Sequence, residues 1–473
     1  MKKILNIAVL AVLALSFSAC EKYLDKLENP NLVTDPPLNG LLTKATYESG
    51  MNVYRMGYNV SYLVQYQTSS SSGSDIDIYN PVNFSSMWTN FYNGMMNIAQ
   101  MNKLAEEKGA TLHLGVGKIL MAYHLNMLIT AFGDVPFSEA FKGQELLTPV
   151  FDDQTTLHAA SLQLLNEGIA ALNQADPSLD LDANSDVIHG GDVDAWIKTA
   201  NALKARFMNQ LSKTSSYNAG NILSVLDDAY ESNADDAKLT AFTDGDPYGS
   251  PWYSVAYDNT QLNLDGWLST NIINAMNGTT YGVFDPRLPL IATITKFGDY
   301  RGTRNGAGRI GSGTNQEESY LWVQGFYSKP NAPIQLVTYA EMKFIEAEAA
   351  FRNGDKETAY NAYIAGITAN MDKVGVATAD KNAYLANPVV AVGKDNITLA
   401  LIFKEKYVAM ILNPEAWVDA RRFDYQYKDF QLPLNAALNT FIRRLAYPDV
   451  EVSRNGPNVP ATGGLDEKLW WDK

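Results

Sequence analysis

Aromatic and polar side chains concentrate between residues 248 and 267, and together they could bind a sugar. Five of these twenty residues are aromatic, whereas aromatics make up 11% of the whole chain. The flat C–H face of a sugar stacks on an aromatic ring, and its hydroxyls bond to amide and carboxylate side chains. The rings are Tyr248, Trp252, Tyr253, Tyr257 and Trp267, interleaved with Asp258, Asn259, Gln261, Asn263 and Asp265.

A second aromatic cluster, Tyr320, Trp322, Phe326 and Tyr327, follows a glycine-rich run over residues 300–313 that we interpret as a flexible loop. Tyr79 lies beside a serine-rich stretch in a polar segment. The alternative role for these rings is a satellite core, because large aromatics are costly to expose. We expect part of the set to be buried and one or two rings to face ligand. The candidate ligand-binding residues are Trp252, Tyr253, Tyr257, Trp267, Tyr248, Trp322 and Tyr79.

Catalytic chemistry would leave clearer patterns than these. The four histidines form no HExxH or other metal spacing, and the sequence has no GxSxG and no GxxxxGK motif. A glycosidase needs two carboxylates about 5–9.5 Å apart, which 52 acidic residues could supply. The carboxylates that stand out, Glu346, Glu348 and Asp419, lie in expected helices where ion pairing explains them. We therefore expect no catalytic residues and no cofactor.

An acidic run over residues 180–186 resembles part of a calcium loop. An EF-hand loop needs glycine at its sixth position and glutamate at its twelfth, where this sequence has Ser185 and Gly191. We therefore expect no metal site in this run.

The composition describes a large, well-packed, acidic protein. The chain has 473 residues, 46% of them hydrophobic, with a formal net charge of −15. This charge argues against nucleic acid or an anionic lipid surface as the main partner. With Cys20 as the only cysteine, an internal disulfide is not possible.

The N-terminus reads as a lipoprotein signal. Lys2 and Lys3 precede an apolar run, and small residues come directly before Cys20. This arrangement resembles a bacterial lipobox, although Phe17 stands where leucine is usual. We expect a signal peptide over residues 1–19, lipidation of Cys20, a polar tether over 20–40 and a single folded domain over 41–473. A diacyl anchor makes membrane attachment lasting.

Helical periodicity dominates most of the folded part. We expect helices over residues 41–54, from about Met87 to Gly109, and over 116–131, 157–172, 192–211 and 397–412. Asp192 is the expected N-cap of the helix it begins, and His124 is expected to be packed or hydrogen-bonded inside its helix. From about residue 241 to 335 the helical periodicity is largely absent, apart from one expected helix over 268–276. This segment predicts a large, loop-rich insertion.

A helical hairpin is predicted over residues 337–371. Two amphipathic stretches meet at Gly354, and Asp355 can cap the second helix. Ala347, Ala359 and Gly366 allow close approach of the two helices around Tyr363. The pattern is similar to a tetratricopeptide unit, which needs neighbouring hairpins to bury its apolar face.

Several stretches in order along the chain resemble the SusD/RagB family of nutrient-binding outer-membrane lipoproteins, in its SusD-like branch. They are CEKYLDK at Cys20, GDVPFSEAF at Gly133, GGDVDAWIKTANALKARF at Gly190, FDPRLP at Phe284, YAEMKFIEAEAAFRNGDKETAYNAY in the hairpin, KYVAM with EAWVDARR, RRLAYPDVE, and GGLDEKLWWD.

The resemblance implies an all-α dominated fold of tetratricopeptide-like hairpins with long loops. It also implies a lipid-anchored outer-membrane protein that faces the cell exterior, binds an oligosaccharide and delivers it to a TonB-dependent, SusC-like transporter. The alternatives are a peptide ligand, or a helical-repeat scaffold that binds another protein and whose aromatics are all structural.

Overall fold

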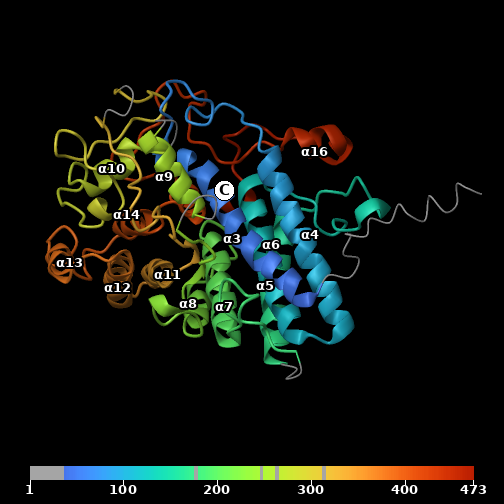
Figure 1. Cartoon of the computed structure of the whole chain (residues 1–473). Coiled ribbons are helices and arrows are strands. Elements are labelled where there is room, and N and C mark those ends of the chain that lie inside the picture. The colour runs from blue at the N-terminus through green and yellow to red at the C-terminus, as the bar shows by residue number, and fades with distance from the viewer. Residues whose placement is uncertain (1–36, 175–178, 245–248, 262–265, 312–315) are drawn as a thin grey trace, which may run out of the picture.

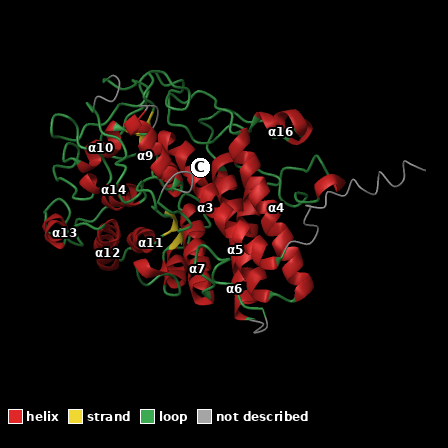
Figure 2. Ribbon diagram, in the orientation of Figure 1, coloured by secondary structure: helices red, strands yellow, loops and turns green. Residues whose placement is uncertain are grey.

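Helices make up most of the fold, and they separate into a packed helical part and a loop-rich part (Figures 1 and 2). A computed structural model describes residues 37–174, 179–244, 249–261, 266–311 and 316–473. The predicted signal peptide, Cys20 and most of the predicted tether therefore lie outside the described residues. The first described helix, α3, begins at Leu38, so the last three residues assigned to the tether are helical.

Five long helices form the first half of the helical part. They are α3 (Leu38–Leu63), α4 (Ser85–Lys108), α5 (Thr111–Phe132), α6 (Gln154–Asn173) and α7 (Val193–Gln210). Helix α5 packs against α4 on one side and α6 on the other. It is long and apolar enough to cross a membrane, but 89% of its most apolar window is buried inside the protein. Its composition therefore reflects a position at the centre of the core.

The second half of the helical part is built on the predicted hairpin. Helices α11 (Tyr339–Arg352) and α12 (Lys356–Val374) pack together, joined at Gly354, where φ is +86°. The Asp355 carboxylate accepts the Thr358 N–H at 3.0 Å, which confirms the expected cap. A Cβ on Gly366 would lie 3.0 Å from the Phe344 ring, so glycine sets the close approach of the two helices. Around the hairpin lie α8 (Ala219–Leu226), α13 (Thr378–Leu385), α14 (Leu399–Ala409) and α15 (Glu415–Arg422).

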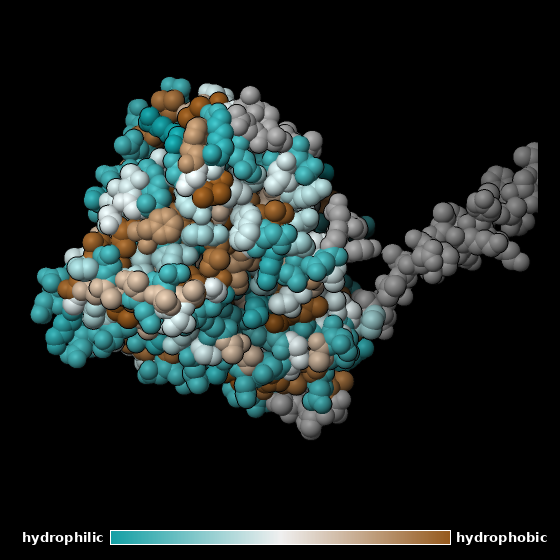
Figure 3. Space-filling model, turned by 60° about the vertical axis from the view of Figure 1, so that its left-hand side comes forward, coloured by the Kyte–Doolittle hydropathy of each residue, from teal (hydrophilic) through white to brown (hydrophobic). Residues whose placement is uncertain are grey.

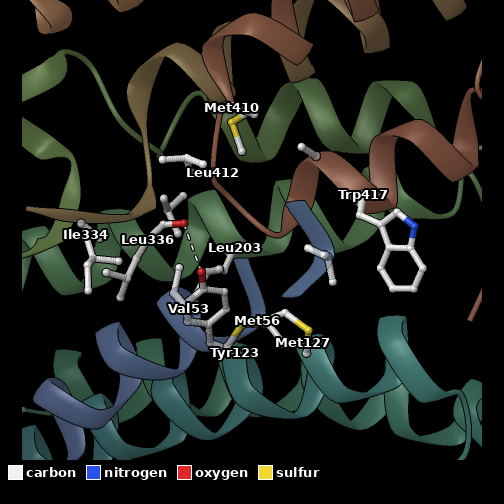
Figure 4. Packing of buried hydrophobic residues seen from close by; sticks show 14 of the residues in the cluster. Val53, Met56, Tyr123, Met127, Leu203, Ile334, Leu336, Met410, Leu412 and Trp417 are labelled. Atoms are coloured by element: carbon white, nitrogen blue, oxygen red, sulfur yellow. Dashed lines mark hydrogen bonds between the residues drawn. The ribbon is translucent and has the colours of Figure 1, made fainter. Parts of the chain in front are cut away.

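Side chains from distant parts of the chain meet in one core. Figure 4 shows Val53 and Met56 of α3 facing Tyr123 and Met127 of α5. The Tyr123 hydroxyl donates to the Leu336 carbonyl at 3.1 Å, which ties the core to the start of the hairpin. The N-cap at Asp192 is confirmed by its bond to Ala195 N–H at 3.0 Å. His124 is buried as expected, with Nδ1 2.9 Å from the Leu120 carbonyl, and burial lowers its pKa to about 4.

Two short antiparallel ribbons fix the insertion to the helices. Strands β2 (Ala237–Leu239) and β4 (Ile334–Val337) pair at the two ends of the irregular segment, with a register shift between Ala237 and Lys238. Strands β1 (Gln67–Thr68) and β3 (Trp267–Leu268) pair and so connect the segment after α3 to the middle of the insertion. The β2–β4 ribbon therefore brings the two ends of the insertion together, and the β1–β3 ribbon holds the insertion beside α3.

The insertion contains more helix than its sequence suggested. The predicted helix is α10, which begins at Thr270, because Trp267 and Leu268 are in β3. A second helix, α9 (Pro251–Gln261), was not predicted. Its buried residues are Trp252, Val255, Ala256 and Asn259, which recur at spacings of three and four. This spacing is typical of an amphipathic helix, but the many aromatic residues of the segment favoured the interpretation as a loop. A last helix, α16 (Asp449–Arg454), lies near the C-terminus.

Candidate functional site

A polar cavity lies between α10 and the segment that follows α15. Its volume is about 170 Å³. The wall on one side comes from α10 and the loop after it, and on the other side from residues 427–433. The polar and charged side chains that line it include Gln65, Asn271, Asn274, Tyr281, Arg304, Lys404, Tyr407, Lys428 and Asp429. Amide, phenol and charged groups thus face one enclosed space.

Asparagines along α10 supply the amide groups. Ser269 begins the helix by accepting the Asn271 N–H at 3.3 Å, and Ile272, Ile273 and Met276 bury the opposite side. Asn271 donates to the Gln65 side chain, so its amide is engaged. Asn274 makes only one long side-chain contact, 3.5 Å from the Asn277 amide, among the described residues. Its half-buried amide is therefore available to a ligand in the cavity.

The inner wall of the cavity is rigid and strained. The Tyr407 hydroxyl donates to the carbonyls of Val64 and Gln65 at 3.1 and 3.0 Å. Gln65 and Asp429 both line the cavity with positive φ, +57° and +60°. Such left-handed conformations in residues other than glycine cost about 1–3 kcal/mol each and cluster at binding sites. The strain at these two positions supports a functional role for the cavity.

The phenols in the cavity stay protonated at neutral pH. Burial raises the pKa of Tyr281 to about 12, and burial holds the pKa of Tyr407 well above its usual value. Each hydroxyl therefore keeps its proton. The Tyr407 proton is shared by the Val64 and Gln65 carbonyls, so the Tyr281 hydroxyl is the one that can donate to a ligand as well as accept from it.

An open groove continues from this cavity along the other side of α10. The groove has a volume of about 710 Å³ and shares Thr270, Asn274 and Thr279 with the cavity. Phe284 is 47% exposed along it, 6.1 Å from the Tyr300 ring between centroids. Cavity and groove together make one cleft, polar at the cavity and aromatic along the groove; we call it the α10 cleft.

Phe284 also borders a second open groove. This groove has a volume of about 670 Å³, and residues at the end of α12 and along α13 form its other side. The Phe284 side chain thus lies at the boundary between two hollows on the surface of the insertion. Figure 3 brings this side of the molecule forward and shows apolar residues in separate patches between hydrophilic ones.

Three of the rings that the sequence predicted to bind ligand are instead buried. Trp252, Trp267 and Tyr79 are each at most 4% exposed. Trp252 packs on Tyr54 of α3 at 4.9 Å, and Trp267 packs edge-on against Tyr320 at 5.2 Å. Trp252 thereby joins the insertion to the helical part, while Trp267 packs within the insertion. Shielding such large rings from water stabilises the fold. They have no open face on which a sugar could stack.

Three other candidates are accessible. Tyr253 and Tyr257 lie one turn apart on α9 with their rings stacked at 5.6 Å, and Tyr257 is 45% exposed. Trp322 is 36% exposed in a different part of the insertion. Their role in ligand binding stays a prediction. Tyr248 lies outside the described residues.

Among the described residues, the aromatic side chains predicted to bind ligand do not line the α10 cleft, so the sequence analysis did not predict this cleft. Its signal is the recurrence of Asn271, Asn274 and Asn277 at a spacing of three within an apolar helix. That spacing places the three amides near one face of the helix. The sequence also gave no indication that residues 427–433 would form the opposite wall.

Two of the acidic residues that stand out in the sequence, Asp186 and Glu348, are engaged in internal contacts. Asp186 accepts the N–H groups of Ile188, His189 and Gly191 and the Trp196 indole N–H. Glu348 pairs with Arg422 at 2.8 Å, as expected for a structural carboxylate. Within the described ranges, no three His, Cys, Asp or Glu side chains gather as they would around a metal ion.

The fold is mostly helical, with the α10 cleft in its loop-rich part. Comparison with known proteins gives its family. A SusD-like family model described as "Starch-binding associating with outer membrane" matches residues 30–448. The chain belongs to this SusD-like branch of the SusD/RagB family, which confirms the resemblance found in the sequence.

Solved structures share the fold at low sequence identity. A SusD homolog from Bacteroides fragilis is 22% identical, with a TM-score of 0.74 over 93% of this chain and 100% of that one. A chitin-binding SusD homolog from Flavobacterium johnsoniae is 19% identical, with a TM-score of 0.75 over 91% and 98% of the two chains. A further chitin-binding protein is 23% identical, with a TM-score of 0.75 over 92% and 100%. No curated protein matches the sequence significantly.

Proposed function

We propose that this protein captures an oligosaccharide in the α10 cleft. The observation that carries the proposal is the continuity of the polar cavity with the aromatic groove across Thr270, Asn274 and Thr279. A sugar residue in the groove has the Phe284 ring for its apolar face. The next residue, in the cavity, has the Asn274 amide and the Tyr281 hydroxyl for its own hydroxyls. Binding sites of this kind combine apolar walls with a few well-placed polar groups.

The ligand leaves the cleft without chemical change. Among the described residues, one carboxylate lines the cavity, Asp429, and the carboxylate of the adjoining groove, Asp299, is paired with Arg301 at 2.7 Å. Glycoside hydrolysis needs two carboxylates in defined roles across the bond that breaks. Capture followed by release fits this cleft better than cleavage does.

The captured sugar passes to a transporter in the outer membrane. The family is described as associating with that membrane, and two solved neighbours are described as chitin-binding. The signal-like residues before Cys20 support lipidation of that cysteine and a position on the outer face of the membrane. The partner we propose is a TonB-dependent, SusC-like barrel.

Substitution at Asn274 tests the proposal. Asn274→Ala removes an amide from the cleft, and Asn97→Ala removes a partly buried amide from α4 as a matched control. Binding to a panel of oligosaccharides is measured by calorimetry. We expect Asn274→Ala to weaken the best ligand about tenfold, the effect of about 1.4 kcal/mol, and Asn97→Ala to leave it unchanged.

The same titration with Phe284→Ala and Tyr257→Ala locates the stacking ring. Loss of affinity in Phe284→Ala places the sugar in the groove. Loss in Tyr257→Ala alone would place it on α9 and overturn the assignment to the α10 cleft. An absence of binding across the whole panel would overturn sugar capture itself.

A further inference from the structure

The α10 cleft differs in charge from the rest of the protein. The whole chain has 15 more acidic than basic side chains. The cavity instead has Arg304, Lys404 and Lys428 in its lining against a single carboxylate, Asp429. A local excess of one sign in a concave site raises the local concentration of the opposite charge.

Lys404 does not contribute to this excess. Its ammonium group contacts the Glu405 carboxylate and lies 2.7 Å from the Tyr384 hydroxyl. Glu405 also pairs with Arg287 at 2.6 Å, and Arg287 pairs with Asp285. Two cations and two carboxylates balance one another in this buried group. The unbalanced charges of the cavity are therefore those of Arg304, Lys428 and Asp429.

Arg304 and Lys428 are exposed, and neither forms an ion pair with a described residue. The Lys428 ammonium donates to the Thr280 carbonyl at 2.8 Å and lies 6.0 Å from the centroid of the Tyr281 ring. These contacts fix the Lys428 charge at the entrance of the cavity. Since they use at most part of its three N–H groups, the ammonium can still bind an anion.

The main chain at Arg304 is held by its neighbour. Asn305 is buried, and its amide donates to the Gln67 carbonyl at 2.9 Å and to the Asp77 carboxylate at 2.6 Å. Its side-chain oxygen accepts the Ser269 hydroxyl at 2.6 Å. Arg304 therefore projects from a fixed point on the cavity wall. A guanidinium group on a fixed main chain suits a planar or tetrahedral oxyanion.

We propose, on the basis of the proposed function, that the oligosaccharide carries an anionic group that Arg304 and Lys428 bind. The chemistry is that of a uronic acid carboxylate or a sulfate ester on a sugar ring. Asp429 lies next to Lys428 in the same wall and accepts hydrogen bonds from hydroxyls of the sugar. The amide of Asn274 orients the same ring.

Paired ligands test this inference. Tetragalacturonate is compared with its methyl ester, and a chondroitin sulfate tetrasaccharide with its desulfated form, while chitotetraose and maltotetraose serve as neutral ligands. Calorimetry is done on the intact protein and on Arg304→Gln and Lys428→Gln, with the exposed Arg454→Gln on α16 as a control. We expect an anionic member to bind best, and each cleft variant to weaken it about tenfold, as for loss of one charge-assisted hydrogen bond.

The two pairs distinguish carboxylate from sulfate. Higher salt is expected to weaken the anionic ligand and to leave the neutral ones unchanged, because ions screen exposed charges. If the neutral ligands bind in an Asn274-dependent manner and as tightly as the anionic ones, the inference is wrong and the proposed function stands. If no ligand of the set binds, the inference is wrong, and the oligosaccharide panel then decides the proposed function separately.

Discussion

The Asp77 carboxylate accepts a hydrogen bond from the Asn305 amide at 2.6 Å and thereby joins the serine-rich loop to the glycine-rich loop. Its other oxygen accepts the Thr68 hydroxyl at 2.8 Å and the Gly306 N–H at 2.5 Å. Gly73 and Gly306 are also bonded through their main chains at 3.1 Å. The glycine-rich run that we interpreted as a flexible loop is thus bonded, at Asn305 and Gly306, to the serine-rich loop that follows α3. Because Asn305 lines the cavity, this contact positions one wall of the α10 cleft.

Asp77→Ala is expected to destabilise the fold and weaken the cleft. The change removes one of the acceptors of the Asn305 amide and the acceptor of the Gly306 N–H, which costs about 1–3 kcal/mol for a buried group. Urea unfolding measures the loss. Asp75→Ala, at an exposed aspartate in the same loop, is the control and should change the free energy of unfolding by less than about 0.5 kcal/mol. Equal stability of the two variants would contradict the role given to Asp77.

The same carboxylate predicts a pH dependence of stability. Burial raises the pKa of Asp77 to about 6, although the hydrogen bonds it accepts act in the other direction. The folded protein holds this proton more tightly than the unfolded chain does. The Asp77 contribution to stability is therefore fully present below the unfolded pKa of 3.8 and is lost as the pH rises through about 6.

A shift of this size corresponds to about 3 kcal/mol. The measurement is the difference in free energy of unfolding between the native protein and Asp77→Asn across this range. It should shrink as the pH rises, because only the native side chain titrates. Parallel curves for the two proteins would show that Asp77 does not titrate in the fold.

Trp252→Ala and Trp267→Ala should act on stability first. Each ring is almost completely buried, and removing a core tryptophan costs about 3–5 kcal/mol. Tyr257→Ala, at an exposed ring of the same segment, should stay within about 0.5 kcal/mol. Thermal unfolding separates these cases. A native-like melting temperature for either tryptophan variant would mean that the ring is not part of the core.

The buried pair of Arg206 and Glu341 predicts a non-additive result. Arg206 Nε lies 2.6 Å from Glu341 Oε1, and both side chains are at most 2% exposed. Glu341→Leu alone leaves a buried charge without its partner, which costs about 3–5 kcal/mol. Combining it with Arg206→Met removes both charges and should recover most of that loss. A denaturation series on both single variants and the double variant measures the coupling, which additive losses would disprove.

Local sequence patterns determined most of the helices and several of their ends, although α3 continues to Leu63, beyond the expected end at residue 54, and α9 was not predicted. The cap at Asp355, the turn at Gly354 and the apolar stripes of α4 to α7 depend on residues within a few positions of one another. The order of family-specific stretches along the chain was also enough to identify the family, which the family model confirms. Both kinds of inference use information that lies along the chain.

Only the tertiary structure decided which aromatic side chains are accessible and which are buried. Trp252 and Tyr257 are five residues apart in one aromatic segment, yet one packs on α3 and the other is exposed. That difference depends on what α9 packs against, which its own residues do not encode. The α10 cleft brings together Gln65, Asn274 and Lys428 from three distant segments. The position of the cleft therefore depends on long-range packing and on the two ribbons that fix the insertion. Local periodicity predicts neither of these, because both join residues that are far apart in the sequence.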